Sequence, residues 1–411
     1  MMNKTNIFKS YLFPMVLISS ILIGGVTGYF FKESSPYLKP LGDIFLNLIF
    51  TTMVPLIFFS ISSAIARTNA RSQLGRIFSS MATIFILTSL VAACLAIVVV
   101  MIFPPAQGID LTIPMTTSPM SGGLLNQLTG LFTVPNFSKL LSHEHMLALI
   151  VFSMLVGVAA SREPKCVAFL QMGEQVFLRV FELIMLYAPI GFFAYFAVLV
   201  NELGPTLISS YARVAGIYYL LALFYFVIVY TLYAYIAGRN TGVNLFWKNV
   251  FLPAATSIAT CSSAASIPAN LVATRAMGVS PEIYETAIPL GSMIHKDGSV
   301  IGGVIKIAFL FGVFHLPFSG GSVILTALGV SLLVGTVMGA IPSGGMLGEL
   351  LILSVYGFPS SALMVIAAIS IIIDPIATLL NVTGNSVSSM LIARCVRGKK
   401  WYADMPSLPG K

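Results

Sequence analysis

The stretch DPIATLLNVTGNSVSSMLIAR, residues 374–394, ends a long apolar run and yet carries one acid and a row of amides and hydroxyls. In a helix that turns by about 100° per residue, five of its polar side chains fall within an arc of roughly 80°. They are Asp374, Thr378, Asn381, Asn385 and Ser388. This face cannot lie against lipid, because an ionisable group at the bilayer centre is costly. We expect it to line a binding site or to form polar contacts between helices.

The composition identifies the class of protein. The chain has 411 residues, of which 57% are hydrophobic and only 9% charged, and its mean hydropathy is +0.95. Soluble domains contain about 25% charged residues. Apolar runs longer than about 18 residues recur along the chain, which predicts membrane-spanning helices rather than the alternating strands of a barrel. The fold class is therefore an all-α polytopic membrane protein.

Positive charge is distributed unevenly between the loops. Most of the 22 lysines and arginines fall in loops and tails on one side, and only Lys32, Lys39, Lys139 and Arg213 are assigned to the other. This bias predicts that both termini are cytoplasmic in a multi-pass plasma-membrane protein, the inner membrane if the source is bacterial. No basic stripe with interleaved aromatic residues is present, so we do not expect nucleic acid as a partner.

The apolar pattern changes in the second half of the chain. Six ordinary spans are expected first, at about 11–31, 40–65, 77–103, 145–160, 172–200 and 211–237. Then two apolar segments, 244–273 and 318–358, are interrupted by TSIATCSSAASIP and GAIPSGG. A full helix follows each of them, at about 282–312 and 362–394.

Each half of an interrupted segment is too short to span a membrane. Non-helical backbone at this depth is tolerated only where it is buried in protein or lines a cavity. Two such segments in corresponding positions of a repeat are typical of a transporter, whose binding site lies between them near the midplane. We therefore expect a transport site where the two interruptions meet.

Several short motifs carry a family resemblance. They are SSAASIP (262–268), HKDGS (295–299), GAIPSGG (339–345), NVTGN (381–385), TS (88–89) and MVPL (53–56). On these motifs the chain resembles the dicarboxylate/amino acid:cation symporters, the glutamate transporter family, over essentially its whole length. The resemblance implies eight transmembrane helices, two re-entrant helical hairpins and inverted repeats, and it implies that the helix over 282–312 is broken at HKDGS. It also implies a homotrimer in membrane lipid that moves substrate by an elevator mechanism.

The resemblance also divides the chain. Scaffold helices would occupy 1–76 and 145–210, and the moving transport domain 77–103 and 211–411, with an external loop at 104–144 between them. The implied activity is secondary active symport of a small molecule with Na⁺ or H⁺ as the coupling cation. It needs no cofactor and is not enzymatic.

Substrate residues follow from the same resemblance. Asp374 matches the residue that binds the substrate amino group, Asn381 the residue that holds the α-carboxylate, and Thr378 a hydroxyl ligand. The hairpin tips supply the other matching residues, which are Ser262, Ser263, Ile341, Pro342, Ser343 and Gly344. The alternatives are an ion pair of Asp374 with Lys296 or Lys306, ordinary helix contacts for the amides and hydroxyls, and a simple capped turn for the two serines.

The residues that match coupling-ion positions are Thr88, Ser89, Gly291, His295, Lys296, Asp297, Asn381 and Asn385. Hydroxyl, amide and carboxylate oxygens are the hard donors that sodium prefers. In this set, Asn385 replaces an aspartate of acidic-substrate relatives, and His295 and Lys296 replace an asparagine and a methionine. Lys296 could take an ion's place electrostatically, and histidine titrates near physiological pH. We expect fewer coupled sodium ions, with a proton in their stead, unless backbone carbonyls keep the sodium sites intact.

The substrate expectation depends on one further departure. Acidic-substrate relatives carry an arginine where this chain has Ala377. A buried acidic side chain would then lack a fixed cation, which favours a neutral amino acid. The alternative is an acidic amino acid or dicarboxylate, with Lys296 as the anion reader.

Two other function classes were considered. An ion channel could use the same polar face, and an intramembrane hydrolase would need a nucleophile–base pair, for which Ser262 or Ser263 would have to approach His295. No GxSxG motif supports the hydrolase. Three further charges, Glu349, Glu182 and Arg179, are expected to be buried and structurally paired.

Overall fold

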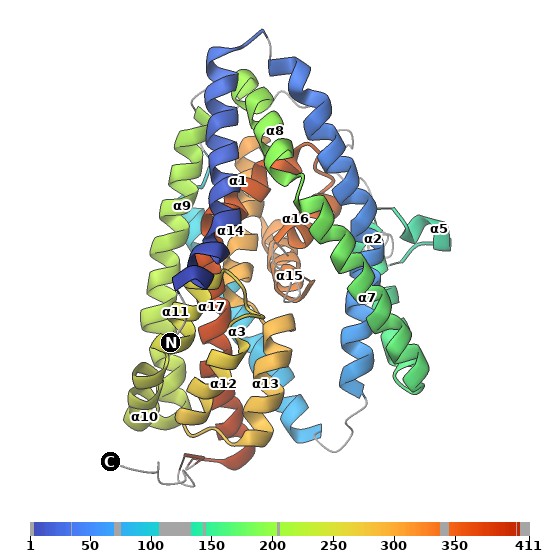
Figure 1. The fold of residues 1–411 in the computed structure, drawn as a ribbon. Helices are drawn as coiled ribbons and strands as arrows, with labels where there is room; N and C mark the ends of the chain where they lie inside the picture. The colour runs from blue at the N-terminus through green and yellow to red at the C-terminus, as the bar shows by residue number, and fades with distance from the viewer. Residues whose placement is uncertain are drawn as a thin grey trace.

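The computed structural model describes residues 4–33, 35–69, 75–106, 133–142, 145–203, 206–337, 345–399 and 401–402. Over these residues the chain is built from helices without a β-strand (Figure 1). Four of the described helices are long and apolar enough to cross a membrane, or five if the bent pair α7–α8 counts as one span. The prediction of an all-helical, multi-pass membrane protein is confirmed.

One group of helices comes from the first half of the chain. It contains α1 (Lys4–Phe30), α2 (Lys39–Asn69), α6 (Met146–Ala160), α7 (Pro164–Met185) and α8 (Ala188–Leu203), with the short η1 (Ser35–Leu38) and α5 (Phe137–Leu140). Helix α1 packs along α8, and α2 packs against α6, α7 and α8. Gly28 permits the first contact, because a Cβ there would collide with the backbone of Ala197.

The span expected over 172–200 is not one helix. It is divided at Leu186 and Tyr187 into α7 and α8, which are bent by 53° relative to each other. The two charges expected to be buried in this region, Arg179 and Glu182, lie on the exposed face of α7, so that prediction was wrong. Most of their neighbours in the sequence are apolar, which had suggested that the whole segment is buried.

The second group surrounds the long helix α17 (Ala362–Arg397). Its other members are α3 (Gly75–Ile102), α9 (Thr206–Phe224), a π-helical turn (Tyr225–Val229), α10 (Tyr230–Asn249), α11 (Phe251–Thr260), α12 (Ile267–Ala276), α13 (Pro281–Ile294), α14 (Asp297–Val313), α15 (Gly321–Val337) and α16 (Gly345–Tyr356). Helix α17 contacts α3, α9 to α14 and α16, and is buried without interruption from Ala377 to Ala393. The polar side chains from Thr378 to Ser388 thus point into protein, as expected, and Asp374 is partly buried.

Two pairs of short helices correspond to the interrupted segments. Helices α11 and α12 pack on each other across a turn at 261–266, where Cys261 adopts a left-handed backbone conformation (φ 46°). Helices α15 and α16 also pack together. The second tip, with Ile341, Pro342, Ser343 and Gly344, lies outside the described residues.

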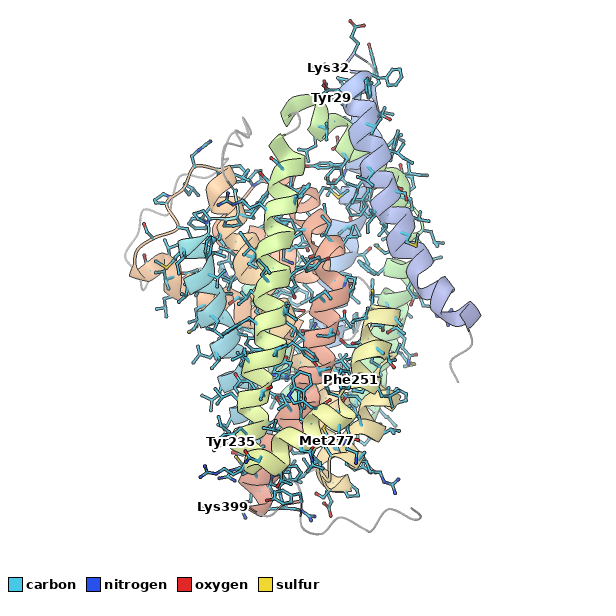
Figure 2. The ribbon with its side chains drawn as sticks, turned by 90° about the vertical axis from the view of Figure 1, so that its left-hand side faces the viewer. Tyr29, Lys32, Tyr235, Phe251, Met277 and Lys399 are labelled. Carbon is cyan, nitrogen blue, oxygen red and sulfur yellow. The ribbon has the colours of Figure 1, made fainter. Side chains whose placement is uncertain are left out.

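The loops and tails that the charge bias assigned to opposite sides of the membrane lie at opposite ends of the molecule (Figure 2). Figure 2 shows Lys32 and Tyr29 at one end and Lys399 and Tyr235 at the other. The loops to which Lys32 and Lys399 were assigned therefore lie at opposite ends of the helices. This is the arrangement that a membrane crossing requires.

Candidate functional site

The site is centred on the break between helices α13 and α14. Helix α13 ends at Ile294 and α14 begins at Asp297, and the two residues between them are extended: His295 has φ −128° and ψ 111°, and Lys296 has φ −146° and ψ 78°. The break lies against α3 and α17. It directs His295, Lys296 and Asp297 into the interior, where their side chains are 1%, 5% and 1% exposed.

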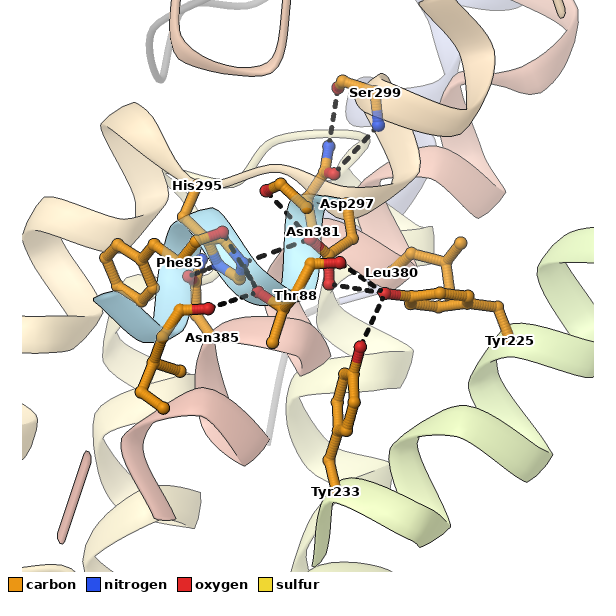
Figure 3. Close-up of polar contacts among 12 residues, drawn as sticks. Phe85, Thr88, Tyr225, Tyr233, His295, Asp297, Ser299, Leu380, Asn381 and Asn385 are labelled. Atoms are coloured by element: carbon orange, nitrogen blue, oxygen red, sulfur yellow. Dashed lines mark hydrogen bonds and ion pairs between the residues drawn. The ribbon is translucent and has the colours of Figure 1, made fainter. Parts of the chain in front are cut away.

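His295 is the centre of the first polar cluster (Figure 3). Its Nδ1 lies 2.8 Å from Asn385 Oδ1 on α17, and its Nε2 lies 2.7 Å from Thr88 Oγ1 on α3 and 3.1 Å from Asp297 Oδ1. The ring stacks on Phe85, with centroids 4.2 Å apart and planes 8° from parallel. Three helical segments thus meet on one imidazole.

Asp297 accepts two more hydrogen bonds, one from α3 and one from the π-helical turn that follows α9. The Ser89 hydroxyl on α3 donates to Oδ1 at 3.2 Å, and the Tyr225 hydroxyl donates to Oδ2 at 3.2 Å. Tyr225 begins the π-helical turn, and its hydroxyl also lies 3.4 Å from that of Tyr233. Neither tyrosine was expected at the site, because a π-bulge that redirects a side chain has no simple sequence pattern.

The first cluster contains hydroxyl, carboxylate and amide oxygens, which are donors that suit a hard cation. In this structure, the imidazole of His295 lies among these oxygens. The Thr88 hydroxyl also donates to the Ile84 carbonyl at 3.0 Å, so both ring nitrogens face oxygens that can accept. The imidazole therefore contacts oxygen atoms from α3, α14 and α17.

Gly291 belongs to the same cluster through its missing side chain. It lies one turn before His295, and a Cβ at this position would collide with Asn385 Oδ1. The glycine therefore lets Asn385 approach the α13–α14 break. Of the residues matched to coupling-ion positions, Thr88, Ser89, Gly291, His295, Asp297 and Asn385 are brought together here.

Asn381 and Ser299 form a second polar contact between α17 and α14. The Asn381 amide nitrogen donates to Ser299 Oγ at 3.1 Å, and its oxygen accepts from the Ser299 backbone N–H at 3.2 Å. One turn earlier, the Thr378 hydroxyl donates to Asp374 Oδ1 at 3.5 Å. Ala377 is buried nearby, where α14 approaches closely at Gly298.

Asp374 lies one turn before Ala377, whose backbone would collide with a Cβ at Gly298 at the start of α14. The first hairpin, with its tip at 261–266, also packs on α17. In the same tip, Ser262 Oγ accepts from the Ala265 N–H at 3.2 Å. Helix α12 is fixed to α17 because the Asn270 amide donates to the Val382 carbonyl at 2.8 Å. Ser263 is buried in this turn.

A third cluster binds α14, α16 and α17 together. Lys306 Nζ donates to Glu349 Oε1 at 3.2 Å and to Ser370 Oγ at 2.8 Å, and the Ser370 hydroxyl donates to the same glutamate oxygen. Both charged side chains are at most 2% exposed. The expected structural pairing of Glu349 is confirmed. An ion pair of Asp374 with Lys306 is not formed, because Lys306 is bound to Glu349.

The hydrolase alternative has no support in these contacts. His295 bonds to Thr88, Asn385 and Asp297, and neither Ser262 nor Ser263 is among its partners. A base needs a nucleophile within hydrogen-bond reach. The site is therefore a set of buried polar groups between helices near the α11–α12 turn, an arrangement consistent with a membrane transport protein.

Comparisons with known proteins define the family. The model of the sodium:dicarboxylate symporter family matches residues 12–395, and the chain belongs to this family. Similar proteins include the proton/glutamate-aspartate symporter of Escherichia coli (strain K12), 28% identical over 95% of this chain and 93% of the relative. The proton/sodium-glutamate symport protein of Bacillus subtilis (strain 168) is 27% identical over 92% of this chain and 90% of the relative.

A third relative differs in its named substrate. The C4-dicarboxylate transport protein of Janthinobacterium sp. (strain Marseille) is 24% identical over 98% of this chain and 92% of the relative. The family resemblance inferred from the short motifs is therefore confirmed. The chain is a cation-coupled symporter of the membrane rather than an enzyme.

Proposed function

We propose that this symporter takes up a small amino acid and that Asp374 binds its ammonium group. The observation that carries the proposal is the position of Asp374. It lies on the part of α17 that packs on the start of α14, and its carboxylate forms no ion pair with any described residue. A carboxylate in a low-dielectric site is a strong partner for a cation. An arriving ammonium would complete this contact.

The amino acid would have a neutral side chain. Ala377 supplies no cation, and Lys306 is already neutralised by Glu349. A second carboxylate of the substrate would thus be desolvated with little compensation. The relatives named for glutamate, aspartate or C4-dicarboxylates support the alternative, an acidic substrate read by Lys296.

Coupling would differ from a sodium-only carrier. His295 fills the oxygen cluster formed by Thr88, Asp297 and Asn385, which supports fewer sodium ions and a contribution from protons. Ser89 and Gly291 complete this cluster. The rival is that backbone carbonyls hold sodium next to the imidazole.

The larger architecture follows the family resemblance. We propose eight transmembrane helices, two re-entrant hairpins in inverted repeats and a homotrimer with both termini cytoplasmic. Residues 1–76 and 145–210 would form the scaffold, and 77–103 and 211–411 the domain that moves as an elevator. The second tip, Ile341 to Gly344, would be its outer gate. The separate packing of α1, α2, α6, α7 and α8 supports this division.

Uptake into proteoliposomes tests the transport proposal. Purified protein is reconstituted, and accumulation of radiolabelled L-alanine, L-serine, L-glutamine, L-aspartate and succinate is followed under separate sodium and pH gradients. We expect a neutral amino acid to accumulate above its external concentration until an ionophore collapses the gradient. Uptake of succinate alone, or flux that rises linearly with concentration as in a channel, would contradict the proposal.

A further inference from the structure

We infer that Lys296 binds the α-carboxylate of the substrate, so that Lys296 and Asp374 together recognise a zwitterion. This inference rests on the proposed function and names the group that completes it. It starts from a buried charge without a partner. The Lys296 side chain is 5% exposed, and no acceptor among the described residues receives a hydrogen bond from its ammonium.

A buried ammonium without an acceptor is strongly disfavoured. Helices rarely retain such a group unless something binds to it. Lys296 is the second residue of the break and directly precedes the first turn of α14. The positive end of that helix adds to the local attraction for an anion. The environment of Lys296 therefore suits an incoming carboxylate.

Asp374 gives the anion a defined position. It lies one turn before Ala377, whose backbone would collide with a Cβ at Gly298, so the start of α14 next to Lys296 packs on the part of α17 that carries Asp374. The two side chains form no ion pair with each other, so both charges are available to a ligand. An amino acid fits this arrangement with its ammonium toward Asp374 and its carboxylate toward Lys296.

The other candidate carboxylate readers are already engaged. Lys306 donates to Glu349 and Ser370. The Asn381 amide uses its nitrogen and its oxygen on Ser299. Ala377 carries no polar group. Lys296 thus remains the only buried cation beside Asp374 that is free to bind a carboxylate within the described part of the chain.

A carboxylate-deletion cycle tests this assignment. Binding of the tightest amino acid in the uptake panel is compared with binding of its carboxamide analogue, in wild type and in Lys296→Met. We expect Lys296→Met to weaken binding of the amino acid by at least about 30-fold and binding of the amide by far less. Lys296→Arg, which retains the charge, should recover part of the loss. Lys248→Met, at an exposed lysine of α10, is the matched control and should bind like wild type.

The outcomes separate the two proposals. If Lys296→Met folds normally by thermal unfolding and binds the amino acid as tightly as wild type, the Lys296 assignment is wrong and the transport proposal stands. The assignment is equally wrong if the variant loses only aspartate, since Lys296 would then read a side-chain carboxylate. A retained affinity with a new requirement for sodium would mean that Lys296 replaces an ion. If wild type neither binds nor accumulates any amino acid, both proposals fall.

Discussion

Two lysines of the same broken segment are both buried but differ in their partners. Lys306, inside α14, is 2% exposed and donates to Glu349 at 3.2 Å and to Ser370 at 2.8 Å. Lys296, at the break, is 5% exposed and has no acceptor among the described residues. One ammonium completes the packing of three helices, whereas the other is left for a ligand. Burial alone therefore does not tell a structural charge from a functional one; the partners do.

Asp374 and Glu349 show the same contrast among the acids. Glu349 is bound to a lysine and a serine, whereas among the described residues Asp374 accepts only a 3.5 Å hydrogen bond, from Thr378. The two acids and two lysines thus form one closed pair and one open pair. We expect mutations in the closed pair to affect folding and mutations in the open pair to affect binding.

The largest effect is expected at the open acid. Asp374→Asn removes the charge that would hold the substrate ammonium, and losing one partner of a buried charge contact costs several kcal/mol. We expect binding of the preferred amino acid to weaken by at least about 100-fold. Isothermal titration measures the loss, and thermal unfolding checks that the variant is folded. Unchanged affinity would remove Asp374 from the site.

The closed pair should respond in stability. Lys306→Met leaves Glu349 buried and unpaired, which should lower the free energy of unfolding by about 3–5 kcal/mol. Lys296→Met removes a charge that already lacks a partner and should leave the stability equal or higher. Denaturation of both variants in the same detergent makes the comparison.

A double variant sharpens the same contrast. Lys306→Met with Glu349→Leu replaces both charges by apolar side chains and should recover most of the stability lost in Lys306→Met alone. If Lys306→Met is as stable as wild type, or if the double variant is no better than the single one, the pair does not hold α14 and α16 together. The distinction between closed and open pairs would then fail.

A smaller change is expected in ion coupling. His295→Asn with Asn385→Asp restores oxygen ligands and a negative charge beside Asp297, which should raise the demand for a bound cation. We expect steeper sodium dependence and a weaker response to a pH gradient in proteoliposomes. The single variants are the controls. Steep sodium dependence without any pH response in wild type would contradict the proposed role of His295.

The smallest effect concerns Gly291. In Gly291→Ala, the new methyl group collides with Asn385 Oδ1 and displaces it from the imidazole. Overpacking of this kind costs about 1–3 kcal/mol. Thermal unfolding should show the cost, and the variant should also have altered cation dependence. Gly216→Ala is the control, because a Cβ there meets nothing within 4 Å. Equal behaviour of the two variants would place Gly291 outside the cluster.

Much of the site could be predicted from the sequence because helical periodicity is regular. Five polar residues of 374–394 share one arc of the helix in the sequence, and those from Thr378 to Ser388 are buried in the structure. The serine-rich interruption at 261–266 marks the first hairpin turn. The break at His295 and Lys296 followed from the resemblance of HKDGS. In each case the decisive information lay within a few residues of the chain.

The remaining features depend on contacts between distant segments. Tyr225 reaches Asp297 only because a π-helical turn redirects it, and Ser299 binds Asn381 only because α14 crosses α17 there. The pairing of Lys306 with Glu349 rather than Asp374 depends on the position of α16. Spacing within one helix does not encode such contacts. The exposed positions of Arg179 and Glu182 escaped prediction for the same reason.

Competition for the open pair tests the central claim, that one free cation and one free acid select a solute with one carboxylate and one ammonium. Binding of L-alanine, L-serine and L-glutamine is measured against that of L-aspartate on the same wild-type sample. We expect a neutral amino acid to bind more tightly and Ala377→Arg, which adds a second cation, to shift the preference toward aspartate. Tighter binding of aspartate by wild type would contradict the account.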